Sequence, residues 1–220
     1  IKDDCSNIIW INTDENNELY ICSVPRDITK QLKNSVWDRE ISHVLTSGTM
    51  SDGTDFEFFK EENGLADIES RLILESKTES PFNYRENARL YAPLGLPFPD
   101  NKNEQYIKRI STEIEKIIKA TNGHTAILFT SYRMLETVYG KLADKLSKYK
   151  LFKMTRGTNN VISDFKKSEN GILFASGSMW EGVDCVGDRL SSVIIVRLPF
   201  PIRNVLMEEK KDRCADVKEY

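Results

Sequence analysis

Short apolar runs alternate with helix-like periodic segments from about residue 70 onward. Strand-like runs are found at residues 89–94, 125–129 (TAILF), 151–155 (LFKMT), 171–175 (GILFA) and 192–196 (SVIIV). Strands that alternate with helices imply right-handed crossovers, and therefore a parallel sheet with helices on its faces. The sequence thus predicts an α/β fold, a three-layer sandwich around a mainly parallel sheet.

The helices expected between these strands are marked by apolar residues three or four positions apart. One apolar face consists of Ile107, Ile110, Ile114 and Ile117. Ser131 is placed to cap a second helix. The buried stripe predicted for that helix is Leu135, Val138, Leu142 and Leu146. A short third helix is expected near Val161, Ile162 and Phe165.

The first part of the chain is organised differently. Residues 7–12 and 18–24 are strand-like runs joined by the polar TDENN, which predicts a hairpin. Asp27 can cap a helix that follows, with an apolar face formed by Ile28, Leu32 and Val36. Residues 43–51, HVLTSGTMS, are an apolar strand-like step that ends in hydroxyls and a glycine. A mixed acidic and aromatic segment follows, and it suggests a boundary between two units.

Composition narrows the class of protein. No run approaches the roughly 18 apolar residues of a membrane span, and residues 1–10 lack a signal-peptide pattern, so a cytoplasmic location is expected. The net charge of −3 gives no basic field, so any nucleic-acid binding would depend on a local groove. The four cysteines include no CxxC pair and the two histidines have no partner at ligand spacing, so free thiols and no metal site are expected.

Residues 171–184, GILFASGSMWEGVD, carry the strongest local signal of a binding site. A buried strand ends in Gly177 and Ser178, and two carboxylates, Glu181 and Asp184, follow around Gly182. Open α/β sheets build their ligand sites from such loops at the carboxyl ends of their strands. The competing interpretation is a solvated turn rich in acids.

Five segments together resemble a known family. LTSGTMS (45–51), SPFNYREN (80–87), LFTSY (128–132), SGSMWEGVD (176–184) and VIIVRLPFP (193–201) occur in the order and rough spacing of DinG/XPD-type superfamily 2 helicases. The first, third and fourth segments resemble motifs III, IV and V of that family. The resemblance implies two RecA-like motor domains with ATP and Mg²⁺ between them. It also implies an ATP-driven motor that moves along single-stranded DNA and unwinds duplexes, in DNA repair or recombination.

Other motifs of that family are absent from the sequence. No GxxxxGK[ST] phosphate loop, DEAH-like acidic box or QxxGRxxR pattern occurs. We therefore expect a C-terminal fragment that is inactive alone. In it, residues 1–66 would be the remnant of the first motor domain with motif III, and residues 67–220 the second motor domain, truncated before motif VI. The expected partners are single-stranded DNA and the first motor domain; any iron–sulfur cluster would take its ligands from outside the fragment.

The resemblance assigns roles by position. The nucleotide-cleft residues would be Glu181, Gly182 and Asp184, which organise ribose or arginine contacts because carboxylates repel phosphates directly. The residues that couple the nucleotide site to DNA would be Ser47, Gly48 and Thr49. The DNA contacts would be Thr130, Ser131, Tyr132, Gly177, Ser178, Arg85 and Arg156. Simpler alternatives are a turn at Ser47 and Thr49, helix capping by Ser131, packing by Tyr132, and solvated arginines.

Two other functions are compatible with the sequence. Glu181 and Asp184 could be the acid and base of a small-molecule transferase or hydrolase, although no GxGxxG fingerprint supports a dinucleotide cofactor. Alternatively, the chain could be a non-catalytic, helicase-derived module that binds DNA or a protein.

Overall fold

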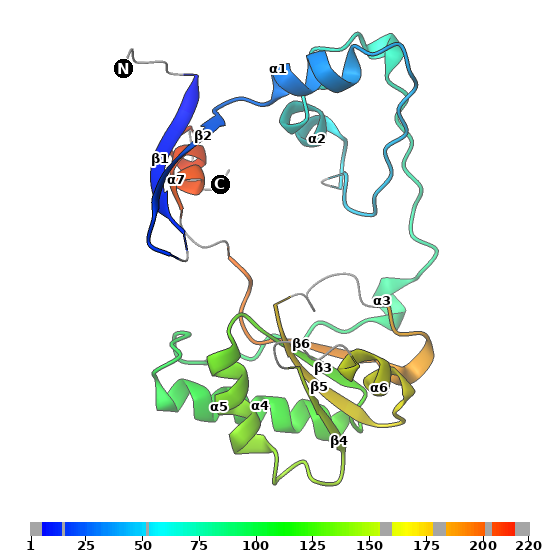
Figure 1. Ribbon diagram of the computed structural model, residues 1–220. Coiled ribbons are helices and arrows are strands. Elements are labelled where there is room, and N and C mark those ends of the chain that lie inside the picture. Colours follow the sequence, from blue (N-terminus) through cyan, green and yellow to red (C-terminus); the bar gives the residue numbers. More distant parts are fainter. Residues whose placement is uncertain are drawn as a thin grey trace. The chain divides into compact units, whose positions relative to one another are not determined.

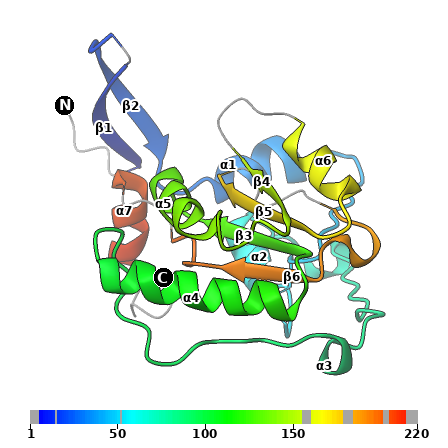
Figure 2. The ribbon, with the colours of Figure 1, turned by 90° about the horizontal axis from the view of Figure 1, so that it is seen from below.

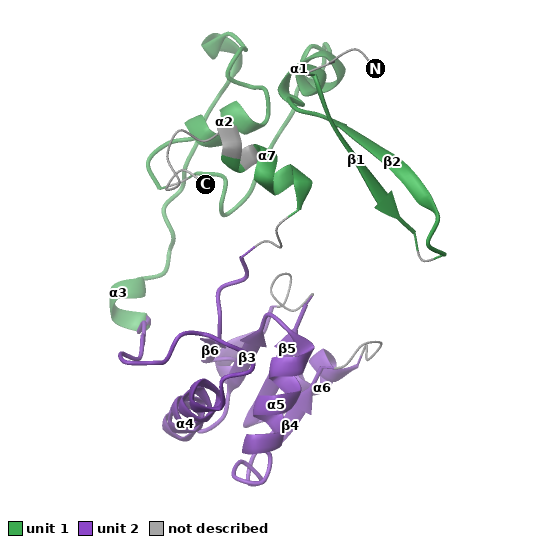
Figure 3. Ribbon diagram, turned by 90° about the vertical axis from the view of Figure 1, so that its left-hand side faces the viewer, with its two compact units in different colours: residues 1–87, 201–220 green, residues 88–200 purple. Residues whose placement is uncertain are grey.

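The computed structural model describes residues 6–14, 16–51, 53–154, 160–177, 184–200 and 204–213. The chain divides into two compact units, one made of residues 1–87 and 201–220 and the other of residues 88–200 (Figure 3). We call them unit 1 and unit 2. The boundary expected near residue 66 from the family resemblance stays a prediction, because it concerns the division between two motor domains.

Unit 2 is built around a four-stranded parallel sheet. Its strands are β3 (Thr125–Phe129), β4 (Lys150–Lys153), β5 (Gly171–Ser176) and β6 (Ser192–Ile195), in the order β4-β5-β3-β6. Every residue of β3 and β5 is buried, as expected for central strands of a parallel sheet covered on both faces. The predicted parallel sheet and four of the strands predicted for this unit are confirmed; the strand expected at residues 89–94 is not formed.

Helices cover both faces of this sheet, with α4 (Glu104–Ala120) and α5 (Tyr132–Leu142) on one face and α6 (Val161–Lys167) on the other (Figure 1). Alternate residues of β5 therefore enter different cores. Ile172 and Phe174 pack with α4 and α5, whereas Leu173 and Ala175 pack with Phe165 of α6. Figure 2 shows α4 beside β6, where the Tyr106 hydroxyl donates to the Val196 carbonyl oxygen over 3.3 Å.

The sequence pattern of α4 and α5 explains how they dock. The Asn103 side chain caps α4 by accepting from the backbone N–H of Gln105 (2.9 Å) and Tyr106 (3.2 Å). The predicted face of α4 needs one correction: Ile118 is fully buried, whereas Ile117 is only half-buried. Ile118, four residues after Ile114, continues the apolar stripe on the side that faces the core. Ile117, three residues after Ile114, lies at the edge of that stripe. The predicted stripe is confirmed as buried: Leu135, Val138 and Leu142 lie on α5, and Leu146 lies in the turn after the helix ends.

Unit 1 begins with the predicted hairpin. Strands β1 (Asn7–Thr13) and β2 (Leu19–Pro25) pair antiparallel, and the Asp14 carboxylate closes the turn by accepting from the backbone N–H of Asn16 and Glu18 (2.8 Å each). The predicted helix follows as α1 (Thr29–Leu32) and a π-helical turn, η1 (Lys33–Trp37). The predicted cap, Asp27, lies one residue before the N-cap position, which is Ile28; its carboxylate accepts from the Thr29 N–H over 2.8 Å.

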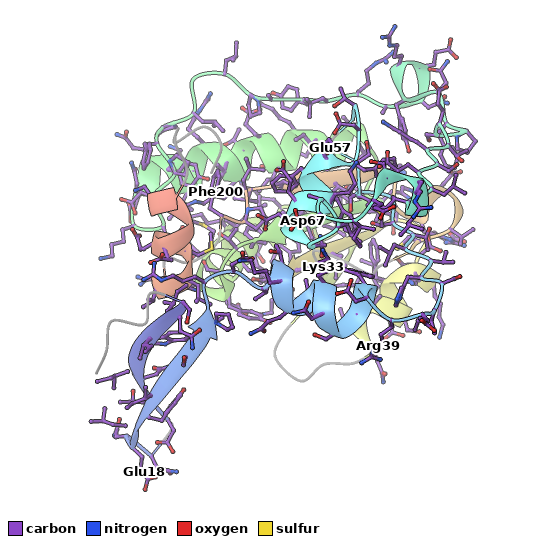
Figure 4. All side chains as sticks on the ribbon, turned by 90° about the horizontal axis from the view of Figure 1, so that it is seen from above. Glu18, Lys33, Arg39, Glu57, Asp67 and Phe200 are labelled. Carbon is purple, nitrogen blue, oxygen red and sulfur yellow. The ribbon has the colours of Figure 1, made fainter. Side chains whose placement is uncertain are left out.

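The rest of unit 1 consists of short helices and extended chain. The helices are α2 (Glu57–Glu62), η2 (Ser70–Leu72), α3 (Tyr84–Asn87) and α7 (Val205–Arg213); in unit 2 a further short turn, η4 (Gly187–Arg189), precedes β6. Trp37 donates to the Asn63 carbonyl oxygen over 2.7 Å, and Lys33 donates to that of Asp67 over 3.4 Å (Figure 4). These bonds join η1 to the chain around α2.

Two expected strands are not formed. Residues 42–47 and 88–93 carry no regular secondary structure and belong to no ladder, and Val44 and Leu90 are 89% and 99% exposed. An apolar run becomes a strand only where a neighbouring chain accepts and donates its backbone hydrogen bonds. Tyr91 instead ties its segment to α4, because its hydroxyl donates to Glu113 Oε2 over 3.0 Å.

Candidate nucleic-acid interface

The carboxyl edge of the unit 2 sheet brings together two of the predicted site segments. Strands β3 and β5 are parallel neighbours in which Phe129 lies opposite Ser176, the last residue of each strand. Parallel strands end at the same edge, so Thr130, Ser131 and Tyr132 emerge there together with Gly177. This neighbourhood follows from the topology, although 45 positions separate Tyr132 from Gly177 in the sequence.

Gly177 lies directly beside the Tyr132 side chain. A Cβ atom built on Gly177 would be 3.5 Å from the Tyr132 hydroxyl oxygen, the nearest atom among the described residues beyond its chain neighbours. The φ angle of Gly177 is +74°, a left-handed conformation that glycine adopts without a steric penalty. The glycine therefore lets the chain turn sharply after β5 and leaves its backbone open beside a phenolic hydroxyl.

The N-terminus of α5 lies at the same edge. Ser131 is extended (φ −149°, ψ 143°) and its hydroxyl accepts from the Met134 N–H over 3.3 Å, so the predicted cap is present. Capping satisfies one of the donors that the first turn of a helix presents, and the positive end of the helix dipole remains. Thr130 is exposed, while Ser131 and Tyr132 are half-buried. Hydroxyls and a helix N-terminus together form a surface suited to an anion.

Only part of the acidic segment belongs to the described residues. Ser178, Glu181 and Gly182 lie outside them, as does Arg156. Asp184 is exposed, and the half-buried Cys185 beside it packs against the core under α6. Burial raises the pKa of the Cys185 thiol, opposed in part by the charge of Lys166.

The predicted motif III residues and Arg85 are found in unit 1. The Thr49 backbone N–H donates to the Ser47 hydroxyl oxygen over 3.2 Å, and the two side-chain hydroxyls are 3.3 Å apart. That arrangement is the turn that the simpler interpretation expected. All three motif residues are exposed, with Gly48 at the centre of the turn, and Arg85 is exposed on α3. The coupling role of Ser47, Gly48 and Thr49 stays a prediction.

The structure adds three residues that the motif comparison missed. Lys153, the last residue of β4, lies with its Nζ 2.8 Å from Glu136 Oε2 and 4.7 Å from the centre of the Tyr139 ring. Glu136 and Tyr139 follow Tyr132 by four and seven positions, the spacing of one helix face. That spacing was visible in the sequence; their pairing with β4 was not, because it depends on how α5 crosses the sheet.

Neither a metal site nor a membrane-spanning helix is found among the described residues. Across those ranges, no three His, Cys, Asp or Glu side chains gather as a metal site would require. None of the helices there combines the length and the apolar character needed to cross a membrane.

The chain is similar to known helicases. Residues 114–219 match the family model described as the helicase C-terminal domain. The chain is 31% identical to the 3'-5' exonuclease DinG of Bacillus subtilis over 90% of its length, but covers only 22% of that relative. It is 30% identical to the ATP-dependent helicase DinG of Mycobacterium tuberculosis and 28% identical to the ATP-dependent DNA helicase YoaA of Escherichia coli, in each case over 30% of the relative.

The chain thus spans less than a third of the length of these relatives. Its parallel sheet with helices on both faces is consistent with the α/β, RecA-like architecture of a helicase C-terminal domain. The ordered motifs, the fold and the matched relatives agree, and together they support a C-terminal region of a DinG-type superfamily 2 helicase.

Proposed function

We propose that the chain is part of an ATP-dependent DNA helicase and that the carboxyl edge of the unit 2 sheet holds the backbone of single-stranded DNA. The observation that carries this proposal is the Tyr132 hydroxyl beside Gly177, at the N-terminus of α5. Each residue comes from a segment that the family resemblance assigned to DNA contacts, Tyr132 from LFTSY and Gly177 from SGSMWEGVD.

The chemistry of the edge favours a phosphate. A helix N-terminus attracts negative charge, and hydroxyls and backbone N–H groups donate to phosphate oxygens without reading base sequence. Thr130 and Ser131 supply hydroxyls, and Gly177 allows a close approach of the backbone. A local site of this kind does not require a basic protein, which agrees with the net charge of −3. Binding would therefore tolerate many DNA sequences.

The nucleotide function of the intact protein is a second part of the proposal. Glu181, Gly182 and Asp184 would face an ATP cleft shared with the first motor domain and organise ribose or arginine contacts. The phosphate loop and the acidic box for Mg²⁺ do not occur in this sequence. We therefore infer that the isolated chain does not hydrolyse ATP, and that translocation, unwinding and a repair role belong to the intact protein. A cytoplasmic location likewise remains a prediction.

ATP hydrolysis by the intact protein tests the motor function. Rates are compared with and without single-stranded DNA for the wild type, Glu181→Ala and Asp184→Ala. The proposal expects strong stimulation by DNA that both variants lose while their circular dichroism stays unchanged. Hydrolysis that ignores DNA, or variants equal to the wild type, would contradict the motor function and the role of the acidic segment.

Direct DNA binding tests the site itself. The chain is titrated against a fluorescein-labelled dT oligonucleotide in low salt, and the anisotropy is followed for the wild type and Tyr132→Phe. We expect several-fold weaker binding by Tyr132→Phe. Tyr149→Phe is the matched control, because the Tyr149 hydroxyl is buried in unit 2 and makes no hydrogen bond with any described residue. Equal affinities for the three proteins would rule out a contact through the Tyr132 hydroxyl.

The other candidate functions receive no support from a specific observation. An acid/base enzyme usually places its catalytic carboxylates in a cleft that shifts their pKa, whereas the Asp184 side chain is exposed. The helicase-derived binding module remains the proper description of the isolated chain if its binding to DNA is confirmed and hydrolysis is absent.

A further inference from the structure

Lys153 is held at the carboxyl end of β4 by two neighbours on α5. Its Nζ lies 2.8 Å from Glu136 Oε2 and 4.7 Å from the centroid of the Tyr139 ring. Tyr139 is itself fixed by an edge-on contact with Phe174, with ring centres 5.1 Å apart and planes at 80°. The ammonium group therefore has a defined position above a ring that is anchored in the core.

The ion pair between Lys153 and Glu136 is accessible to solvent, so another anion can replace Glu136. The side chains of Lys153 and Glu136 are 29% and 51% exposed. Ion pairs in contact with water contribute about 0–1 kcal/mol, so a competing anion can replace the glutamate at little cost. A contact between a cation and a ring face stabilises by a similar free energy at an exposed site, about 0.5–1 kcal/mol. This contact is kept when an anion replaces Glu136.

The position of this pair relates it to the proposed phosphate site. Glu136 follows Tyr132 by four residues on α5, which places the two side chains one helical turn apart on the same face, about 5–6 Å between Cβ atoms. The Tyr132 hydroxyl lies beside Gly177. Lys153 ends the strand next to β5, and β5 leads into Gly177. Lys153 pairs with Phe174 of β5, three residues before the glycine where the DNA backbone is expected.

We infer that Lys153 is an additional DNA-contacting residue: Glu136 holds its ammonium group when DNA is absent, and a phosphate of the single strand replaces Glu136 when DNA binds. Tyr139 keeps the ammonium in place during the exchange. This inference rests on the proposed function, since it names a further contact at the same edge. Lys153 would also add a positive charge at the carboxyl edge of the sheet. Thr130, Ser131, Tyr132 and Gly177 supply none.

Salt dependence of DNA binding tests the contact. The affinity of the full chain for a labelled dT oligonucleotide is measured at several salt concentrations for the wild type, Lys153→Gln and Lys153→Arg. Losing one phosphate contact lowers the magnitude of the slope of log K against log salt by about 0.7, which is roughly an eight-fold loss at 50 mM salt relative to 1 M. Lys153→Arg should retain the wild-type slope, because the charge is kept.

Lys150→Gln is the matched control. Lys150 is the first residue of the same strand, and its Nζ lies 5.3 Å from the Phe152 ring centre, so it too is a lysine over an aromatic ring. It stands at the opposite end of β4 from the proposed site. We expect Lys150→Gln to retain the wild-type slope, although it changes the net charge equally. Equal slope changes in Lys150→Gln and Lys153→Gln would indicate a general charge effect and overturn the inference.

The exchange with Glu136 is tested by a double-mutant cycle. Glu136→Gln should tighten binding, because it frees the ammonium group and removes a nearby negative charge. In the Lys153→Gln background the gain should shrink, since no ammonium remains to be freed; an equal gain in both backgrounds overturns the exchange. Wild-type binding with an unchanged slope in Lys153→Gln overturns this inference alone, whereas the absence of binding by the wild type overturns the proposed function as well.

Discussion

At the scale of single residues, two glycines of unit 2 share a backbone conformation but differ in their surroundings. Gly123 and Gly177 have φ angles of +87° and +74°. A Cβ on Gly123 would lie 2.5 Å from the Asn170 carbonyl oxygen, a backbone atom. Among the described residues, a Cβ on Gly177 would contact the Tyr132 hydroxyl alone, at 3.5 Å. Glycine is therefore required at position 177 because of the left-handed backbone conformation. At position 123 it is required for the same reason and also because there is no room for a Cβ atom.

Alanine at these positions should separate the two effects. Gly177→Ala is expected to destabilise unit 2 by about 1–2 kcal/mol, the cost of a left-handed residue with a side chain. Gly123→Ala should cost at least twice as much, because the turn before β5 must also move. Hydrogen exchange at the β3 amides gives both free energies of opening. Equal losses would show that the chain around Asn170 gives way easily.

At the scale of elements, the buried face of α4 rests on Ile118 rather than Ile117. Ile118 is fully buried in the core with α5 and β5, and Ile117 is half-buried. Ile118→Ala should lower the free energy of unfolding by about 2–5 kcal/mol, the usual range for a buried isoleucine. Ile117→Ala, with the same change of volume, should cost clearly less. Urea titrations monitored at α4 by hydrogen exchange would measure both.

The link between residues 88–94 and α4 predicts a pH effect. Lys116 donates to Glu113 Oε1 and Tyr91 to Oε2, each over 3.0 Å. The bond from Lys116, followed by that from Tyr91, holds the pKa of Glu113 below its ordinary value. The contribution of this carboxylate to stability is therefore present above its unfolded pKa and is lost as pH falls through the folded one.

Removing the Tyr91 hydroxyl should raise the pKa of Glu113 toward the ordinary value. Carboxyl ¹³C NMR titration of Tyr91→Phe measures the shift. Glu115 serves as the internal control: its pKa is lowered by Lys119 and Lys145, and neither contact involves Tyr91. An unchanged titration of Glu113 would mean that Lys116 alone accounts for the low pKa.

The elements that the sequence predicted correctly are those with a repeated local pattern. The hairpin, β3, β5 and the stripe of α5 each carry several residues that agree on one period. The strands expected at residues 43–47 and 89–94 were predicted wrongly, because an apolar run does not indicate whether a neighbouring strand is available to pair with it. The contacts of the candidate site also include some that the sequence could predict and some that it could not. The meeting of Tyr132 with Gly177 follows from parallel topology, but the pair between Lys153 and Glu136 depends on how α5 packs.

At the scale of the whole molecule, the two units have very different cores. Among the described residues, the buried apolar side chains lie in unit 2 apart from Ile8 of β1. The hairpin of unit 1 exposes large apolar side chains instead: Ile11 is 68% and Ile21 75% exposed. Because burial of apolar surface is the main source of stability, the two units should differ in how readily their backbones open.

Native-state hydrogen exchange measures this difference. The amides of β3 and β5 should exchange slowest, and those of β1 and β2 orders of magnitude faster, since a two-stranded hairpin is marginally stable without a covering layer. If the chain acts within a longer helicase as proposed, the rest of the first motor domain would cover the apolar hairpin, and its amides should become protected in the intact protein. Protection in the isolated chain equal to that of β3 would contradict the uneven stability. Protection in the isolated chain and the intact protein to the same degree would show that Ile11 and Ile21 need no such cover.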